Sequence, residues 1–309
     1  MILVWGSTTD EPVAAVLDAL EDRSATVAHL DDETLQSLQY DLVIGPQPKG
    51  WLEIGGNRID IGKICGVYLR PGPHPAGAAA VAASALLSVV QTHSSTVINR
   101  PAAGRSNLVK PFQLAALAAA GLMTPDTLVT TDPTEAHAFL NRHRRIVYKS
   151  LSGIRSVVAA IGLGDLSSER LDQLGHGPVQ LQQWIGGTDV RVHVVGERWF
   201  ATTIASDATD YRYASTSGRP PELTACELPE VLGQQLVAVT RAMGLLVSGV
   251  DLRRTPRGEW FCFEVNPSPG FTYYEAHTSQ PIAGAIADLL LDATGVSVCA
   301  SGAPLVSDL

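Results

Sequence analysis

The segment at residues 247–270 constrains the fold more than any other part of this chain. Its sequence is Val-Ser-Gly-Val-Asp-Leu-Arg-Arg-Thr-Pro-Arg-Gly-Glu-Trp-Phe-Cys-Phe-Glu-Val-Asn-Pro-Ser-Pro-Gly. Two β-rich apolar runs flank Arg257-Gly258, and glycine supplies the positive φ that a two-residue hairpin loop needs. We therefore expect a β-hairpin whose loop is Arg257-Gly258.

In such a hairpin three oxygen-bearing side chains share one face. Asp251 falls opposite Glu264, and Asn266 lies two residues further along the same strand. Two carboxylates about 4 Å apart repel by roughly 4 kcal/mol at an effective dielectric near 20. A divalent cation relieves that repulsion, and hard oxygen ligands suit Mg²⁺. A surface hairpin with three unrelated polar residues fits the same pattern, although its apolar lining favours a buried hairpin, in which carboxylates need partners.

Composition excludes several classes of protein. The 309 residues allow two or three packed units. A net charge of −9 argues against nucleic-acid and anionic-membrane partners, which require basic patches. The four cysteines show no C-x-x-C spacing, so we expect neither a zinc site nor a disulfide framework. Residues 1–5 are too short and uncharged for a secretory signal, and the alanine-rich run at 76–90 is too short to span a bilayer, so a cytoplasmic location is expected.

The order of apolar runs and breaks predicts three units. The first is an open α/β unit, with strands expected at residues 2–5, 26–30, 41–44, 66–70 and 96–99, helices at 11–21 and 76–91, and a small hairpin at 52–61. The second follows a boundary at 100–105, with a helix at 110–120 and strands at 146–149, 157–161 and 179–185. The third follows Gly186-Gly187, with strands at 190–195 and 199–205, a helix at 229–243, the hairpin, a helix at 281–293 and a loose tail.

Lys149 ends one of these strands and is followed by Ser150-Leu-Ser-Gly153. A lysine at a strand end before a Ser/Gly turn reaches a phosphate while the backbone N–H groups of the turn approach it. Taken alone, the segment fits a solvated lysine at the end of a strand better. Because Gly153 is the only glycine of the turn, the segment matches neither a P-loop nor a dinucleotide fingerprint.

Residues 182–191 predict a strand, a glycine hinge and a second strand. The hinge offers backbone N–H and C=O groups that suit the edge of an adenine, and Asp189 beyond it suits ribose hydroxyls. Asp189, Arg191 and His193 alternate onto one face, which points Arg191 toward a phosphate or a carboxylate. A plain ion pair between Asp189 and Arg191 is the alternative.

Taken in order, these pieces resemble the ATP-grasp superfamily over roughly residues 98–291. The likeness is greatest to RimK-like carboxylate–amine ligases and to the microviridin-type (graspetide) peptide maturases. Val67-Tyr-Leu-Arg70-Pro and Asn99-Arg-Pro…Lys110-Pro-Phe-Gln-Leu also look like the maturases. The resemblance implies an α+β, α/β chain of the ATP-grasp fold, with an N-terminal pre-ATP-grasp domain at 1–104 and two lobes, at 105–186 and 187–309, clasping the nucleotide.

The resemblance also implies a role for each motif residue. By this resemblance, Lys149 and Lys110 contact the ATP phosphates. Gln183, Trp184 and Ile185 surround the adenine, and Asp189 contacts the ribose. Asp251, Glu264 and Asn266 bind two Mg²⁺ ions. Arg191 and Lys149 stabilise the reacting phosphate oxygens, and Arg155 is a substitute anion contact in the glycine-poor loop. By the same resemblance, Arg70 and Asp210-Tyr-Arg212 bind the substrate, although a mobile surface loop fits residues 206–219 as well.

The implied reaction is carboxylate activation: ATP and a carboxylate give an acyl phosphate and ADP, and an amine then displaces phosphate. The expected substrate is a peptide or amino acid, and the expected product is an amide. A graspetide maturase forming side-chain ester or amide macrocycles, with an amine or hydroxyl acceptor, is one alternative. A non-catalytic Mg-ATP-binding regulatory module is another. A homodimer is compatible with all three.

Overall fold

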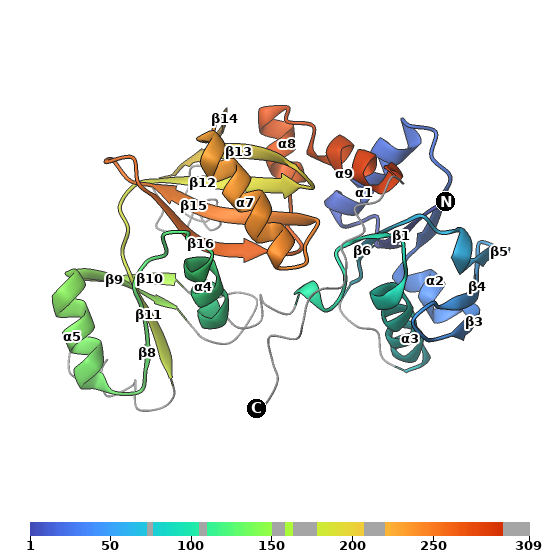
Figure 1. Cartoon of the computed structure of the whole chain (residues 1–309), viewed down its shortest axis with the longest axis horizontal. Coiled ribbons are helices and arrows are strands. Elements are labelled where there is room, and N and C mark those ends of the chain that lie inside the picture. The colour runs from blue at the N-terminus through green and yellow to red at the C-terminus, as the bar shows by residue number, and fades with distance from the viewer. Residues whose placement is uncertain (73–76, 105–109, 150–157, 163–177, 207–219, 293–309) are drawn as a thin grey trace.

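The computed structural model describes residues 1–72, 77–104, 110–149, 158–162, 178–206 and 220–292. Three units follow one another across the molecule in Figure 1, each built around a sheet. The N-terminal unit lies at one end, a small four-stranded unit lies at the other, and the five-stranded sheet that carries the candidate site lies between them.

The N-terminal unit is a parallel sheet covered on both faces. Its strands are β1 (Ile2–Gly6), β2 (Val27–Leu30), β6 (Gly66–Arg70) and β7 (Thr96–Ile98), in the order β2-β1-β6-β7. Ile2 and Val4 face a core shared with α1 (Glu11–Glu21), whereas Leu3 and Trp5 face α3 (Ala78–Thr92). Burial on both faces explains why residues 2–5 are a continuous apolar run rather than an alternating one.

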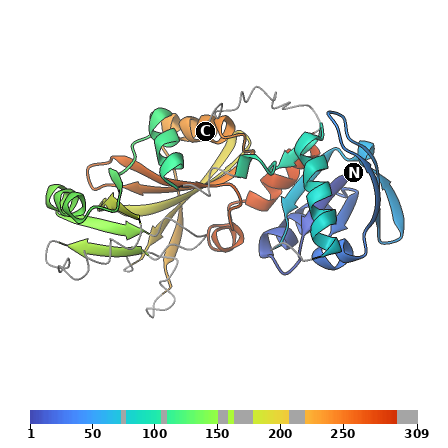
Figure 2. The same cartoon turned by 90° about the horizontal axis from the view of Figure 1, so that it is seen from below.

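The C-terminal helix α9 (Ile282–Leu291) packs on this N-terminal unit. Its Ile282, Ile286 and Leu290 join the core beneath α1, and α9 contacts α1, β6 and β7. Figure 2 shows α9 beside the N-terminal elements, far in sequence but close in space. Elements near the start of the chain and residues 282–291 therefore meet at one sheet, which sequence order alone does not indicate.

A second, antiparallel sheet flanks the first. It consists of β3 (Gln39–Val43), β4 (Lys49–Ile54) and β5 (Asn57–Asp60), in the order β3-β4-β5, with the short helices α2 (Asp32–Gln36) and η1 (Ile61–Lys63) nearby. The predicted strand at 41–44 and hairpin at 52–61 therefore belong to one small sheet rather than to the parallel one. Leu52 and Ile59 pack it onto the same core as α3.

The four-stranded unit contains β8 (Thr127–Thr130), β9 (Arg145–Lys149), β10 (Val158–Gly162) and β11 (Val179–Gln183), in the order β10-β9-β11-β8. Strand β10 pairs with β9 in antiparallel register. One face is covered by α5 (Pro133–His143), whose Phe139 and Leu140 pack against Ile146. Neither β8 nor α5 was predicted from the sequence.

The five-stranded antiparallel sheet has the order β14-β13-β12-β15-β16. Its strands are β12 (Thr188–Val195), β13 (Arg198–Ala205), β14 (Glu222–Cys226), β15 (Val247–Arg254) and β16 (Trp260–Asn266). The helices α4 (Lys110–Ala119) and α7 (Glu230–Ala242) cover one face, and α8 (Thr272–Thr278) follows β16. Strand β14 and helix α8 also went unpredicted.

The hairpin β15–β16 forms, but its loop differs from the two-residue loop expected. Thr255 N donates to the Glu259 carbonyl at 2.8 Å and Gly258 N donates to the Thr255 carbonyl at 2.9 Å, which encloses the three residues Pro256-Arg257-Gly258. Gly258 has φ +86°, the left-handed residue that ends such a loop. An odd loop shifts the register by one residue, and a β-bulge at Phe263 restores it, so that Asp251 still pairs with Glu264.

Candidate nucleotide and metal site

Alternation along β12, β15 and β16 sorts apolar side chains to one face of the sheet and polar side chains to the other. Val190, Val192, Val250, Leu252 and Val265 are buried with α4 and α7 in one core. The residues between them point to the opposite face. That site face carries Asp189, Arg191, His193, Gly249, Asp251, Arg253, Glu264 and Asn266.

At one end of the site face lie the predicted metal ligands. Asp251 pairs in the ladder with Arg191 on one side and with Glu264 on the other. Arg191 Nη1 donates to Asp251 Oδ1 at 2.6 Å, and the Arg191 side chain is only 7% exposed. Asn266 Oδ1 accepts from Ser268 N at 2.9 Å, which turns the chain after β16. We call Arg191, Asp251, Glu264 and Asn266 the metal end.

Gly249 makes room for the guanidinium of Arg191. A Cβ at this position would lie 2.6 Å from Arg191 Cζ and 2.7 Å from Pro269 Cβ, closer than side chains approach. Gly249 pairs with His193 on β12 and with Asn266 on β16. The absence of a side chain at residue 249 therefore lets Arg191 lie flat on the sheet and reach Asp251.

Two amide side chains from other parts of the chain fix the strands of the metal end. Gln113 of α4 is buried; its Nε2 donates to the Val265 carbonyl at 2.8 Å, and its Oε1 accepts from Val265 N at 3.0 Å. Asn99, after β7, donates to the carbonyls of Val247 and Pro267 and accepts from Leu246 N and Val247 N. Val265 lies between two predicted ligands, so Gln113 holds the edge strand on which both are placed.

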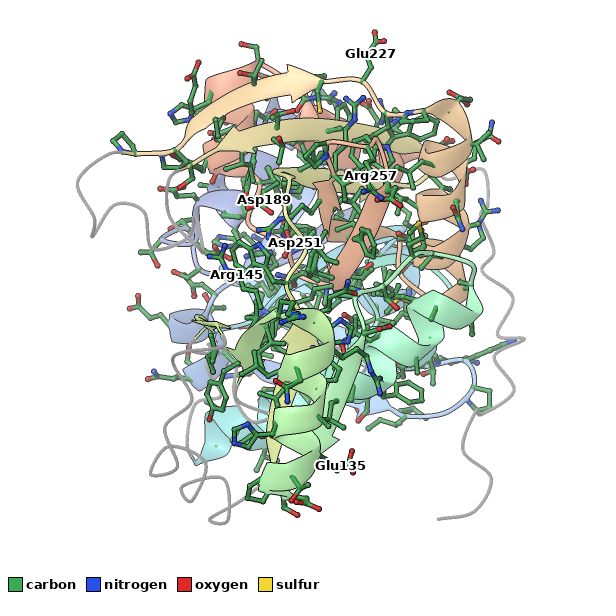
Figure 3. All side chains as sticks on the ribbon, turned by 90° about the vertical axis from the view of Figure 1, so that its left-hand side faces the viewer. Glu135, Arg145, Asp189, Glu227, Asp251 and Arg257 are labelled. Carbon is green, nitrogen blue, oxygen red and sulfur yellow. The ribbon has the colours of Figure 1, made fainter. Side chains whose placement is uncertain are left out.

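At the other end of the site face, Asp189 pairs with Arg253 rather than with Arg191. Arg253 Nε and Nη2 donate to the two carboxylate oxygens of Asp189 at 2.7 and 2.9 Å, and Nη1 donates to the Ile185 carbonyl at 2.8 Å. The Asp189–Arg191 ion pair considered from the sequence is not the one observed. Instead Asp189 pairs with Arg253 and Arg191 pairs with Asp251, in each case across neighbouring strands. We call Asp189, Arg253 and Ile185 the hinge end; Figure 3 shows Asp189 near Asp251, between the two sheets.

The lysine of the four-stranded unit reaches toward the same sheet. Lys149 Nζ donates to Gln182 Oε1 at 2.7 Å and lies 5.7 Å from the centre of the Phe263 ring. The bulge turns Phe263 to the site face beside Glu264, and Arg253 Cζ lies 5.4 Å from the same ring. Phe263 thus lies within reach of cations from both units.

The hinge residues lie between the two sheets. Gln183 N and Trp184 N donate to the carbonyls of Asp126 and Arg145, at 2.8 and 3.2 Å. The Trp184 ring lies under the Arg145 guanidinium, with Cζ 3.9 Å from its centre, so its indole is held against the four-stranded unit. Ile185 is buried, and its N–H has no backbone partner among the described residues. The contact of this donor with an adenine edge stays a prediction.

The remaining predicted residues are dispersed. Lys110 is the first residue of α4, one turn before Gln113. Arg70 ends β6; it donates to Asp10 Oδ2 at 2.6 Å, to Ser268 Oγ at 2.9 Å and to the Pro269 carbonyl at 3.0 Å. Arg70 therefore joins the N-terminal sheet to the loop after Asn266. Arg155, Asp210 and Arg212 lie outside the described residues.

His193 is the innermost titratable group of the site face. Burial and, to a smaller extent, the charge of Arg191 lower the pKa of His193 to about 3, and the hydrogen bond to the Gly270 carbonyl opposes this shift. Nε2 lies 3.2 Å from that carbonyl and therefore carries the proton of the neutral ring, whereas Nδ1 is buried without a partner in the described structure.

The donor set of the metal end fits Mg²⁺. It supplies carboxylate and amide oxygens and no sulfur, the ligands that this hard ion prefers. In the ladder two formal negative charges, from Asp251 and Glu264, face the single positive charge of Arg191, so one negative charge is left over. The groups that could hold a cation are therefore present, and Asn266 has a second acceptor lone pair beyond the one that Ser268 uses.

Comparison with known proteins identifies the family. A model described as "RimK-like ATP-grasp domain" matches residues 107–290, more than half of the chain. This chain belongs to the RimK-like ATP-grasp family. A probable alpha-L-glutamate ligase of Photobacterium profundum is 31% identical over 151 residues, 47% of this chain and 50% of that protein. The chain thus spans about half the length of the curated relatives that it matches.

Solved structures extend the likeness to nearly the whole chain. The ATP-grasp ligase PsnB, in complex with a phosphomimetic variant of its minimal precursor, Mg and ADP, superposes with a TM-score of 0.79 at 26% identity, over 95% of this chain and 98% of that one. A RiPP-associated ATP-grasp ligase of Chryseobacterium gregarium, with ADP and a leader and core peptide, superposes with a TM-score of 0.80 at 22% identity, over 95% and 97%. The second match shows the fold alone. The expected ATP-grasp fold is confirmed.

Four residues that build the site were given no role from the sequence: Gln113, Asn99, Arg253 and Gly249. One of them had a usable signal, because Arg253 is two residues from Asp251 and must share its face. The two amides stand in the motif Asn99-Arg-Pro…Lys110-Pro-Phe-Gln-Leu, which resembles the maturases, but the motif did not indicate their partners, which are backbone groups far away in the sequence. None of the helices in the described part of the chain has the length and apolar character needed to span a bilayer.

Proposed function

We propose that this chain is an ATP-dependent carboxylate–amine ligase that acts through an acyl phosphate. The observation that carries the proposal is the ladder Arg191–Asp251–Glu264, in which Arg191 Nη1 lies 2.6 Å from Asp251 Oδ1. One guanidinium beside two carboxylates matches a site that holds a phosphate chain with its cations. Lys149, reaching toward Phe263 from the other sheet, supplies a second cationic group.

The chemistry requires positioning rather than a covalent nucleophile on the protein. A substrate carboxylate oxygen attacks the γ-phosphorus of ATP; a P–O bond forms, the bond to the ADP oxygen breaks, and ADP leaves with the electron pair. The amine then attacks the acyl carbon, phosphate leaves, and the nitrogen loses a proton. In the proposal, Lys149 and Arg191 offset the charge on the phosphate oxygens, and the partly buried site excludes water that would hydrolyse the acyl phosphate.

Asp251, Glu264 and Asn266 are the residues that would hold Mg²⁺, and we propose two ions. Magnesium, when bound, offsets the negative charge of the ATP phosphates. The nucleotide itself would lie against the hinge, with adenine at Gln183 and Ile185, ribose at Asp189 and phosphates toward Lys149 and Lys110. The proposal draws support from the position of Asp189, which lies in the same strand as Arg191 and two residues from it.

Product analysis tests the reaction class. The purified chain is incubated with Mg-ATP and a panel of carboxylate and amine pairs that includes L-glutamate, and the nucleotide products are separated. ADP and phosphate that appear only when both substrates are present support the proposal. AMP and pyrophosphate would exclude the acyl-phosphate route. Tight binding of Mg-ADP with no turnover on any pair would favour the non-catalytic module instead.

A peptide maturase is the second candidate function. The full-length match to PsnB, which was solved with a minimal precursor, favours a peptide substrate. In this form the carboxylates are Asp or Glu side chains of a peptide, and the acceptors are Lys, Ser or Thr side chains of the same chain. Asp210 and Arg212 would face the acidic side chains, and Arg70 is the third residue proposed for the substrate.

Mass spectrometry separates the two forms. Peptides that contain both acidic and Lys, Ser or Thr residues are incubated with enzyme and Mg-ATP. A loss of one water for each ADP released, within a single peptide, indicates macrocycle formation. Addition of a free amino acid indicates the general ligase. The two outcomes have opposite mass changes, so neither can be taken for the other.

A further inference from the structure

Arg253 joins several separate elements of the described structure at the site face. It starts on β15 and reaches Asp189 on β12 with two hydrogen bonds, of 2.7 and 2.9 Å. A third, of 2.8 Å, goes to the Ile185 carbonyl in the hinge. Its guanidinium also lies 5.4 Å from the rings of both Trp184 and Phe263. These contacts come from the hinge, from β12 and from β16.

The geometry of the Arg253–Asp189 pair fixes the orientation of the Asp189 carboxylate. Two parallel N–H···O bonds between a guanidinium and a carboxylate set the plane of both groups, which a single bond does not. The Arg253 and Asp189 side chains are only 14% and 22% exposed, so solvent competes weakly for either. Asp189 is thereby held in one orientation before any ligand arrives.

The same arginine fixes the hinge. The chain between Ile185 and β12 passes closely over the end of β15, because a Cβ on Gly187 would lie 2.8 Å from the Arg254 carbonyl carbon. Gly187 has φ +153°, a conformation in which L side chains are strained. With Arg253 bound to the Ile185 carbonyl, the hinge is attached to β15 at two successive points. Asp189 and Ile185 are therefore set relative to each other by one side chain.

We propose that Arg253 is a positioning residue for the nucleotide, which acts by orienting Asp189 toward the ribose hydroxyls and by fixing the hinge beside it. This inference rests on the proposed function, in which Asp189 faces the ribose. Arg253 itself needs no contact with the ligand. An ionised carboxylate accepts about four hydrogen bonds, so two from Arg253 are compatible with acceptance from a ribose.

The test uses two nucleotides that differ by one hydroxyl. Binding of Mg-ADP and of Mg-2′-deoxy-ADP to the full chain is measured by titration calorimetry for the wild type, Arg253→Met and Arg254→Met. Methionine keeps an apolar side chain at residue 253 and removes the guanidinium group that donates the paired hydrogen bonds. Arg254 is the matched control, because it is the neighbouring arginine of the same strand but is exposed and lies 5.7 Å from the Trp260 ring.

We expect the wild type and Arg254→Met to prefer ADP over its 2′-deoxy form by about tenfold or more, and Arg253→Met to bind both weakly and almost equally. If Arg253→Met does not fold, Arg253→Lys replaces it; this variant keeps the charge and loses the paired bonds, and it should show a reduced preference. If Arg253→Met, or Arg253→Lys in its place, preferred ADP over 2′-deoxy-ADP as strongly as the wild type does, the inference would be overturned. A wild type that binds ADP without preference would also overturn it, whereas a wild type that binds no nucleotide would refute the proposed function itself.

Discussion

The metal end and the hinge end of the site face use the same residue types for opposite purposes. At the metal end two carboxylates, Asp251 and Glu264, stand beside one guanidinium, so the ladder carries a formal charge of −1. At the hinge end one carboxylate, Asp189, is matched by one guanidinium, so the charges cancel. The first arrangement suits a cation with its phosphates, and the second suits neutral groups such as a ribose and a purine.

The two ends also differ in how their strands are held. Neutral amides from outside the sheet, Gln113 and Asn99, fix the metal end. An amide offers both a donor and an acceptor, so it satisfies backbone N–H and C=O groups without adding charge. A charged side chain of the sheet itself fixes the hinge end. Gln113 and Asn99 therefore hold these strands without changing the formal charge of the ladder.

The largest effect should come from removing one charge at the metal end. In Glu264→Gln the side chain keeps its size, but the ladder loses its net negative charge and with it the attraction for a cation. We expect turnover to fall on the order of a thousandfold, with little change in the thermal midpoint. Glu259→Gln, on the loop of the same hairpin, is the control and should retain full activity. Near-normal turnover of Glu264→Gln would refute the metal assignment.

A methyl group at Gly249 should act on the same end without changing any charge. The added Cβ of Gly249→Ala displaces the Arg191 guanidinium from Asp251, and a misplacement of about 1 Å in a catalytic group costs on the order of a hundredfold in kcat. Gly270→Ala is the control, since its Cβ meets nothing within 4 Å. Gly187→Ala, at the hinge end, should instead raise KM for ATP. Equal effects of Gly249→Ala and Gly187→Ala on kcat and KM would remove the distinction between the ends.

Removing the amide of Gln113 should have a smaller effect on activity than the changes at Glu264 and Gly249. Gln113→Leu leaves the Val265 N–H and C=O buried without their partner, and each orphaned group costs about 1–3 kcal/mol in the free energy of unfolding. Since Val265 lies between Glu264 and Asn266, we also expect the Mg²⁺ concentration for half-maximal activity to rise by about tenfold. Gln234→Leu, an exposed substitution on α7, should change neither quantity. A stability loss with unchanged Mg²⁺ dependence would limit Gln113 to a structural role.

The sequence indicates the pairing of Asp251 with Glu264 but not the way in which the chain achieves it. The expected two-residue loop and the observed three-residue loop differ by one residue, and a one-residue shift would turn Glu264 away from the site. The bulge at Phe263 corrects the shift, and no local pattern marks a bulge without glycine. The prediction was right about the pair and wrong about the loop.

Elements with short or polar patterns were the ones missed. Helix α5 has nearly balanced apolar and polar residues, and β14 alternates over only five residues, so neither has a strong period. The N-terminal strands and α1 were predicted because their apolar residues form clear runs in the sequence, and these residues are buried in the two cores on either face of the sheet. Partners far apart in sequence, such as Gln113 with Val265 or α1 with α9, depend on packing that a single sequence does not record.

The smallest expected effect concerns His193, which lies beyond Arg191 on the same face. Its folded-state pKa is depressed from 6.5 to about 3 by burial, so the folded protein binds this proton less readily than the unfolded chain does. Stability from this group is therefore fully present above pH 6.5 and is lost as the pH falls, by about 1.4 kcal/mol per pH unit down to about pH 3.

Urea unfolding of wild type and His193→Gln from pH 7 to pH 5 measures the difference, since Gln does not titrate and still offers a donor to the Gly270 carbonyl. Parallel curves for wild type and His193→Gln would mean that the metal end admits a proton at His193, and hence that it is more open to solvent than the hinge end.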